Sequence, residues 1–161
     1  MTAPVVLAIR NPDMRATLCH LLKEEAGYEV IETHNGLSTL TALLTSWRPL
    51  VVVLDSHLDG HNAAERLLRL ALTGGPAGRH QYVIYTTCTL EELPPSLAAC
   101  ATLAGMPMLA VPFGANDLLH TVAACQSALP IAWAGLTRQL PLGEGDRGSD
   151  LRSSLRYLSK S

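Results

Sequence analysis

Two polar residues stand at the ends of apolar runs, where side chains are well placed to do chemistry. Asp55 follows the run Leu50–Leu54, and Thr87 closes the run Tyr82–Thr87. If these runs are parallel strands, their carboxyl ends meet at one edge of the sheet, which is where ligand sites form. A carboxylate and a hydroxyl there could belong to a functional site. They could equally be a structural anion and a polar strand cap.

A second group of candidate ligands lies in the loop beyond Asp55. His57, Asp59 and His61 have a spacing that could bind a transition metal. No fourth ligand is visible, so we predict a solvated loop and no metal site. The glycines of residues 74–78 lack the GxGxxG and GxxxxGK patterns of phosphate-binding loops, and no GxSxG nucleophile elbow is present. The sequence therefore predicts no cofactor and no enzyme activity.

The composition argues against several classes of protein. The chain has 161 residues, 48% hydrophobic and 16% charged, which is typical of one domain with a core and not of a disordered chain. A net charge of -2 lacks the excess of positive charge that is typical of proteins that bind nucleic acid or an acidic membrane. The sequence has no signal-peptide pattern and no apolar stretch of the roughly 18 residues that a membrane span needs. Four cysteines without CxxC spacing are typical of reduced thiols, so we expect a cytoplasmic protein.

Short apolar runs alternate with stretches of helical periodicity over residues 4–129. The first helix is predicted to begin with Asn11 as its N-cap and Pro12 in its first turn, and Gly27 ends it. This alternation predicts a parallel sheet with helices on both faces. The five predicted strands are Val5–Ile9, Tyr28–Thr33, Leu50–Leu54, Tyr82–Thr87 and Met108–Val111.

A change of character at Pro130 divides the chain. The proline is predicted to close the fifth helix (Asn116–Leu129) and the domain of residues 1–130. Residues 131–161 form a C-terminal extension with an apolar segment at 131–142, a flexible linker at 143–148 and a possible terminal helix at 149–160. We expect the apolar segment, with Trp133, to pack onto the domain or a second subunit. The terminal helix is the candidate for partner recognition.

In their joint order these features resemble the receiver domain of two-component response regulators. The resemblance covers about residues 4–128, and rests on the element order, on Asp55 and Thr87, and on Pro112-Phe113 after the fifth strand. It implies a flavodoxin-like, doubly wound, five-stranded parallel sheet of order 2-1-3-4-5 with five helices. The first and fifth helices would share one face and the other three the opposite face. It also implies a phosphoacceptor position at Asp55, a switch hydroxyl at Thr87 and a cis bond before Pro112.

The positions that carry the family's phosphoryl chemistry are only partly kept. The resemblance places Ile9 and Arg10 where receivers hold a divalent metal with an acidic pair, and Val111 where they have a lysine. Ile9 and Arg10 offer no oxygen ligands and Val111 offers no cation, so the charge of an incoming phosphoryl group is poorly neutralised. We therefore predict a degenerate site of the pseudo-receiver type, in which Asp55 and Thr87 are vestigial. The Arg10 guanidinium is predicted to approach or pair with the Asp55 carboxylate, directly or through water, and the alternative is that it points into solvent.

Two functions follow from this resemblance. The first is a phosphorylation-independent signalling module that binds a protein partner or a second copy of itself. The surface expected to bind is the face of the fourth helix, fifth strand and fifth helix, with Leu97, Met108 and Leu119 as candidate contacts. The alternative is a stand-alone response regulator in a phosphorelay, with Asp55 as its phosphoacceptor. A flavodoxin-like small-molecule binder is a third class, for which the sequence offers no motif.

Overall fold

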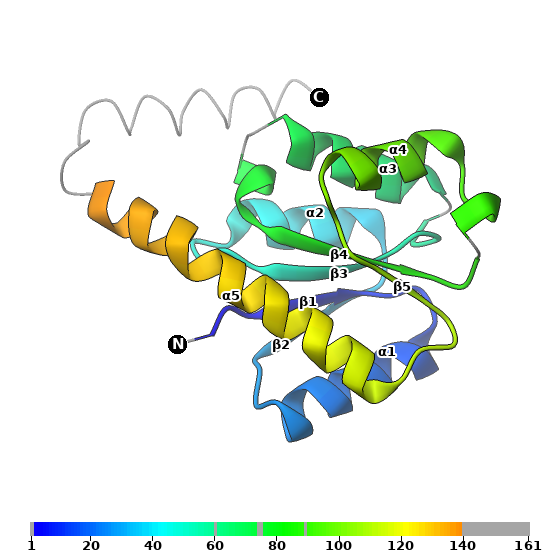
Figure 1. Cartoon of the computed structure of the whole chain (residues 1–161), viewed down its shortest axis with the longest axis horizontal. Helices are drawn as coiled ribbons and strands as arrows, with labels where there is room; N and C mark the ends of the chain where they lie inside the picture. The colour runs from blue at the N-terminus through cyan, green and yellow to red at the C-terminus, as the bar shows by residue number, and fades with distance from the viewer. Residues whose placement is uncertain (1, 60, 74–75, 89, 140–161) are drawn as a thin grey trace.

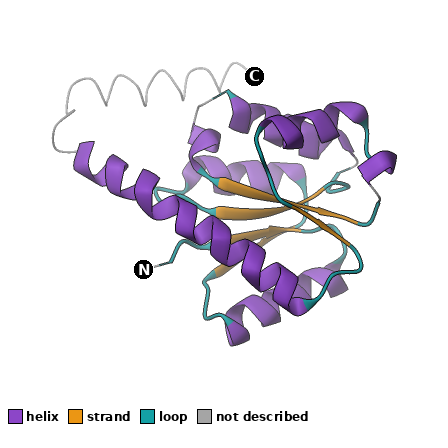
Figure 2. Cartoon of the chain, in the orientation of Figure 1, coloured by secondary structure: helices purple, strands orange, loops and turns teal. Residues whose placement is uncertain are grey.

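The chain forms a central parallel sheet covered by helices on both faces (Figure 1, Figure 2). The computed structural model describes residues 2–59, 61–73, 76–88 and 90–139. For residues 61, 76–77, 90 and 130–139 it describes the backbone alone. In the described part of the chain, no helix is long and apolar enough to cross a membrane.

The sheet has the strand order β2-β1-β3-β4-β5, and all neighbouring strands pair in parallel. Both the order and the parallel pairing confirm the prediction. Each strand is short, and the four strands other than the fifth are rich in β-branched or aromatic residues, which suits a sheet buried on both faces. The strands are β1 (Val5–Ala8), β2 (Val30–Thr33), β3 (Val51–Asp55), β4 (Gln81–Thr86) and β5 (Met108–Ala110).

The helices divide between the two faces as predicted. Alternate residues of the strands point to opposite faces, so Val5 and Leu7 pack against α1 and α5, and Val6 and Ala8 pack against the other helices. The first layer consists of α1 (Pro12–His20), its π-helical continuation η1 (Leu21–Glu25), and α5 (Ala115–Gln139). The second layer consists of α2 (Gly36–Thr45), α3 (His61–Leu72) and α4 (Pro95–Leu103).

Local signals in the sequence fix where the first two helices begin and end. Asn11 caps α1, because its side-chain oxygen accepts a hydrogen bond of 3.0 Å from the backbone N–H of Met14. Asn35 caps α2 in a capping box with Ser38. Gly27 follows η1 with a φ of +70°, a conformation that glycine adopts without strain.

The fifth helix departs from the prediction, because Pro130 does not end it. α5 runs from Ala115 through Pro130 to Gln139 (Figure 1). An interior proline removes one helical hydrogen bond and costs about 3 kcal/mol. The turns before Pro130 are anchored in the core by Val122, Cys125 and Leu129, which lets the helix continue beyond it. The domain boundary at residue 130 stays a prediction, and this residue lies inside a continuous helix.

The remaining predictions for the C-terminal extension concern residues that the structure describes in part or not at all. The apolar segment 131–142 enters α5 as far as Gln139, and its side chains, including that of Trp133, are outside the described part. The linker at 143–148 and the helix expected at 149–160 also lie outside the described residues.

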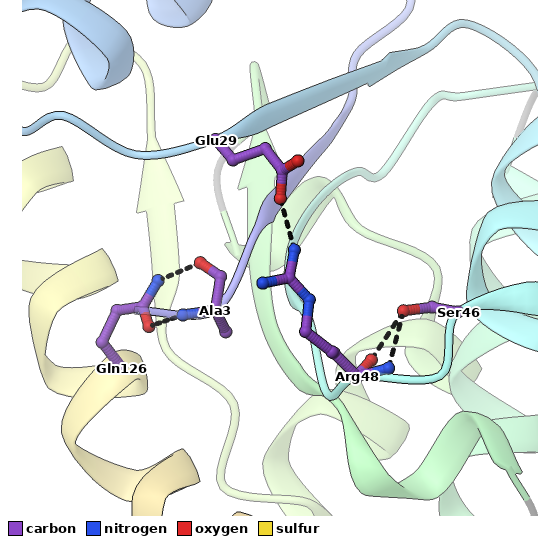
Figure 3. Close-up of polar contacts among 5 residues, drawn as sticks. All are labelled: Ala3, Glu29, Ser46, Arg48 and Gln126. Atoms are coloured by element: carbon purple, nitrogen blue, oxygen red, sulfur yellow. Dashed lines mark hydrogen bonds and ion pairs between the residues drawn. The ribbon is translucent and has the colours of Figure 1, made fainter. Parts of the chain in front are cut away.

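Polar contacts fasten the start of the chain and the edge of the sheet (Figure 3). The Gln126 side chain of α5 accepts a hydrogen bond of 2.8 Å from the Ala3 N–H and donates one of 2.7 Å to the Ala3 carbonyl. Arg48, before β3, forms an ion pair with Glu29, before β2. Because Gln126 is 9% exposed, its paired contacts hold β1 against α5.

His80 is a buried polar residue that joins two neighbouring elements. Its Nδ1 accepts a hydrogen bond of 2.9 Å from the Leu50 N–H, just before β3. Its Nε2 lies 2.9 Å from the Leu43 carbonyl, which belongs to the last turn of α2. Carbonyls in the last turn of a helix lack a partner within the helix. His80, at 3% exposure, therefore caps α2 from inside the protein.

Candidate functional site

A pocket of about 790 Å³ opens at the carboxyl edge of the sheet, where β1, β3, β4 and β5 end. Parallel α/β sheets place their ligand sites at this edge. Residues that follow four strands, and the first turn of α1, meet there although they are far apart in the sequence. The lining includes Arg10, Asp13, Asp55, His57, Thr87 and Val111.

Asp55 is the last residue of β3 and points into this pocket with 5% of its surface exposed. Its Oδ2 accepts a hydrogen bond of 2.9 Å from the Arg10 backbone N–H. Its Oδ1 accepts one of 2.8 Å from the His57 backbone N–H. Two backbone donors thus stabilise a carboxylate that burial would otherwise penalise. Burial, and secondly the negative charge of Asp55, raise the pKa of the neighbouring Tyr85 hydroxyl.

The two residues after β1 behave differently from the acidic pair of a working receiver. Ile9 is fully buried and belongs to the core between the sheet, α1 and α5. Arg10 is exposed, and its side chain lines the pocket. Among the described residues, neither position therefore brings a carboxylate toward Asp55.

The ion pair predicted between the Arg10 guanidinium and Asp55 is wrong as a direct contact. The salt bridges among the described residues do not include it. The backbone N–H of Arg10 makes the contact instead, because the chain leaving β1 turns its amide toward the end of β3. An exposed guanidinium keeps its hydration, and a surface pair would return only about 0–1 kcal/mol.

Two threonines follow each other at the end of β4 and have different surroundings. Thr87, the predicted switch hydroxyl, is exposed and lines the pocket with Asp55. Thr86 is fully buried, accepts a hydrogen bond of 3.0 Å from the Ser56 hydroxyl and another of 3.0 Å from the Cys88 N–H. Sequence reasoning did not single out Ser56, Thr86 or Cys88. The available signal was that Ser56-His57 and Thr86-Thr87-Cys88 sit at the ends of neighbouring strands.

Val111 stands on the rim of the pocket, 37% exposed. It offers an apolar side chain where a cation would be needed to contact phosphoryl oxygens. The Val111–Pro112 bond is cis, as predicted. Phe113 packs edge-on against Tyr85 with ring centroids 6.0 Å apart, so the loop after β5 is attached to the end of β4.

The candidate partner contacts are not all on the surface. Leu97 is fully buried in the core beneath α4, so its assignment as a partner contact is wrong. It belongs to the inward stripe of α4, which faces the sheet. Met108 and Leu119 are half-buried and pack against the core, with part of their surface accessible.

The transition-metal arrangement considered for the loop beyond Asp55 is not assembled in the described residues. Asp59 accepts a hydrogen bond of 2.5 Å from the Gly36 N–H at the start of α2. His57 instead faces Ser56 and Cys88. The His61 side chain lies outside the described part. Across the part of the chain that is described, no three His, Cys, Asp or Glu side chains are grouped to hold a metal ion.

Comparison with known proteins identifies the fold. No family model and no curated protein sequence matches the chain. Among solved structures, a CheY-like response regulator receiver domain from Methanospirillum hungatei superposes with a TM-score of 0.67 at 14% identity, over 82% of this chain and 99% of that one. The fold is that of response regulator receiver domains.

Two further structures of this fold agree with that assignment. The Vibrio cholerae chemotaxis protein CheY4 has a TM-score of 0.61 and 21% identity, over 78% of this chain and 99% of that one. The beryllofluoride-activated NtrC4 receiver domain dimer has a TM-score of 0.62 and 18% identity, over 80% of this chain and 99% of that one. At these identities the likeness concerns the receiver fold and leaves the chemistry to be argued from the residues.

Proposed function

We propose that this chain is a phosphorylation-independent, receiver-like signalling module that is not an enzyme and acts by binding another protein. The observation that supports this most strongly is the surroundings of Asp55. The backbone amide of Arg10, in the segment after β1, donates a hydrogen bond of 2.9 Å to Oδ2, where a metal site would need oxygen ligands. The Ile9 side chain is packed into the core.

The charge balance of the pocket supports the same proposal. Phosphoryl transfer to a carboxylate brings anionic groups together, so a site for it has to supply neutralising charge. Val111 supplies none, and Arg10 supplies one cation on a flexible side chain without the fixed geometry of a metal ion. The Asp55 carboxylate already accepts two backbone hydrogen bonds, which hold it in one position.

One observation favours the alternative, a stand-alone response regulator that accepts a phosphoryl group on Asp55. Asp13, in the first turn of α1, lines the same pocket as Asp55. Mg²⁺ often binds proteins through one or two carboxylates and keeps several waters. Two carboxylates in one pocket could therefore hold a weakly bound cation. Phosphorylation of the unmodified chain distinguishes the two functions.

The surface we propose for the partner, or for a second copy, is the face of α4, β5 and α5. Leu103, at the end of α4, is 81% exposed. Met108 on β5 and Leu119 on α5 are half-buried. Covering an exposed apolar side chain such as that of Leu103 with a partner removes apolar surface from water, which favours association. The NtrC4 receiver domain is described as a dimer, which supports self-association as the first case to test. The net charge of -2 gives no reason to propose a nucleic acid or a membrane as the partner.

Leu103→Glu is expected to weaken self-association at least about tenfold, since tenfold corresponds to about 1.4 kcal/mol and a buried apolar anchor contributes more than that. Sedimentation equilibrium of the full chain measures the effect. Leu37→Glu is the matched control, because Leu37 is 76% exposed on α2, outside the proposed face.

The same experiment tests independence from phosphorylation. Adding Mg²⁺ and a small phosphodonor such as acetyl phosphate is expected to leave the association constant of the wild type unchanged. A protein that stays monomeric throughout, or one whose association appears only with the phosphodonor, would contradict the proposal for a second copy as the partner.

A further inference from the structure

A thiol and an imidazole face each other beside the Asp55 pocket. Cys88 follows β4 and His57 follows β3, and these two strands are neighbours in the sheet. The Cys88 Sγ lies 3.5 Å from the His57 Nε2, within hydrogen-bonding distance for sulfur. Both residues are half-buried, and His57 also lines the pocket. The pair therefore lies at an accessible edge of the sheet and not in the core.

Hydrogen bonds among the residues at the two strand ends indicate which nitrogen of the neutral His57 ring carries the proton. The Ser56 hydroxyl donates its proton to Thr86 Oγ1 at 3.0 Å. The Ser56 Oγ also lies 2.9 Å from His57 Nδ1. Because the Ser56 O–H already donates to Thr86, Oγ accepts a hydrogen bond from Nδ1–H. This tautomer leaves the lone pair of Nε2 directed at the Cys88 thiol. Thr86 also accepts a hydrogen bond of 3.0 Å from the Cys88 N–H, which fixes the backbone of the cysteine.

This arrangement matches the general pattern of an activated nucleophile. A base stands within reach of the nucleophile's proton, and a third group orients the base. Here Cys88 would be the nucleophile, His57 the base and Ser56 the orienting group. The thiolate, and not the thiol, is the reactive form of cysteine, so a base in this position increases reactivity.

We propose that Cys88 is the reactive thiol of this chain and a site of modification by hydroperoxides, with His57 as its base. The thiol proton passes to His57 Nε2, and the sulfur attacks the hydrogen-bearing oxygen of the hydroperoxide. An S–O bond forms and the O–O bond breaks. The sulfur is oxidised by two electrons to a sulfenic acid, and the alkoxide or hydroxide that leaves takes the proton from the imidazolium to become an alcohol or water.

The other three cysteines lack this arrangement. Burial raises the pKa of the Cys19 thiol, with a further contribution from Glu32, and burial alone raises the pKa of the Cys125 thiol. Cys100 is half-buried on α4, and the hydrogen bonds of the described residues give its sulfur no imidazole. Cys100 is therefore the matched internal control, with similar exposure and no base.

The test treats the full chain with hydrogen peroxide and a dimedone trap for sulfenic acid, and follows each cysteine peptide by mass spectrometry over time. We expect Cys88 to be trapped at least about tenfold faster than Cys100, since a positioned general base contributes about a hundredfold or more to many reactions. His57→Gln is expected to slow trapping at Cys88 about tenfold and to make its rate depend more steeply on pH. Cys100→Ser is expected to leave the Cys88 rate unchanged.

Two outcomes would overturn the proposal. One is equal trapping of Cys88 and Cys100 in the wild type, a comparison that needs no variant to fold. The other is an unchanged Cys88 rate in His57→Gln with an unchanged unfolding midpoint, which would leave His57 a structural role alone.

Discussion

Arg10→Asp is expected to bind Mg²⁺ at least about tenfold more tightly than the wild type. The substitution removes a cation from the pocket and adds a third carboxylate to those of Asp13 and Asp55. Mg²⁺ requires oxygen ligands, and tenfold in affinity corresponds to only about 1.4 kcal/mol. The fold should tolerate the change, because the Arg10 side chain is exposed and its backbone N–H still donates to Asp55. Isothermal titration calorimetry measures the affinity.

The controls for this experiment separate a rebuilt site from a general effect of charge. Adding Asp13→Asn to Arg10→Asp should remove most of the gain if Asp13 is a ligand. Adding Val111→Lys should raise phosphorylation of Asp55, because it restores a cation at the pocket rim. Ile9→Asp is a poor choice, since it would bury a carboxylate in the core where Ile9 is fully buried. If the wild type binds Mg²⁺ as tightly as Arg10→Asp, the site is not degenerate.

His80→Ala is expected to lower the free energy of unfolding by about 3–5 kcal/mol at pH 7. The change leaves the buried Leu50 N–H and Leu43 carbonyl without partners, at about 1–3 kcal/mol each, and creates a cavity. Equilibrium unfolding in urea measures the loss. His120→Ala is the matched control, since His120 is exposed on α5, and we expect a change within about 0.5 kcal/mol.

The same pair of proteins should show a specific dependence on pH. Burial lowers the pKa of His80 from 6.5 to about 4 in the folded state. Between these values the unfolded chain binds a proton at His80 and the folded chain does not, so stability falls as the pH falls. The contribution of neutral His80 to the free energy of unfolding is fully present above pH 6.5, and about 3 kcal/mol of it is lost on reaching pH 4. The gap between wild type and His80→Ala should therefore narrow over this range. A gap that stays constant would show that His80 is not buried in its neutral form.

The architecture could be predicted from the sequence because it depends on local patterns. Apolar runs such as Leu50–Leu54, alternating with helical stripes, predicted the parallel sheet with helices on both faces, and the resemblance to receivers implied which helices share a face. The cap at Asn11 depends on neighbours within one helical turn, and it too was predicted correctly. The same patterns could not show how far a helix extends, since α5 continues through Pro130 against its local preference.

The site could be predicted in its position but not in its contacts. That Asp55, Thr87 and Val111 share a pocket follows from their places at strand ends. Which atom of Arg10 meets Asp55 depends on the direction of the backbone after β1, and no residue pattern specifies it. Leu97 was assigned to the surface because an apolar helix stripe looks the same whether it faces a core or a partner.

Polar contacts between residues far apart in the sequence could not be predicted either, because they depend on how the elements pack. His80 lies outside the five predicted strands, yet it is buried between α2 and β3. The contact between Cys88 and His57 joins residues 31 positions apart in the sequence. Only the packing of β3 beside β4 brings these two side chains together.

The intact mass of the wild-type chain after incubation with Mg²⁺ and acetyl phosphate tests the central proposal most directly. Asp55→Asn, which removes the candidate acceptor and nearly keeps its shape, serves as the control. A degenerate site predicts the same mass before and after incubation for both proteins, with no acid-labile modification. An increase by one phosphoryl group in the wild type that is absent from Asp55→Asn would contradict the proposal and establish Asp55 as a working phosphoacceptor.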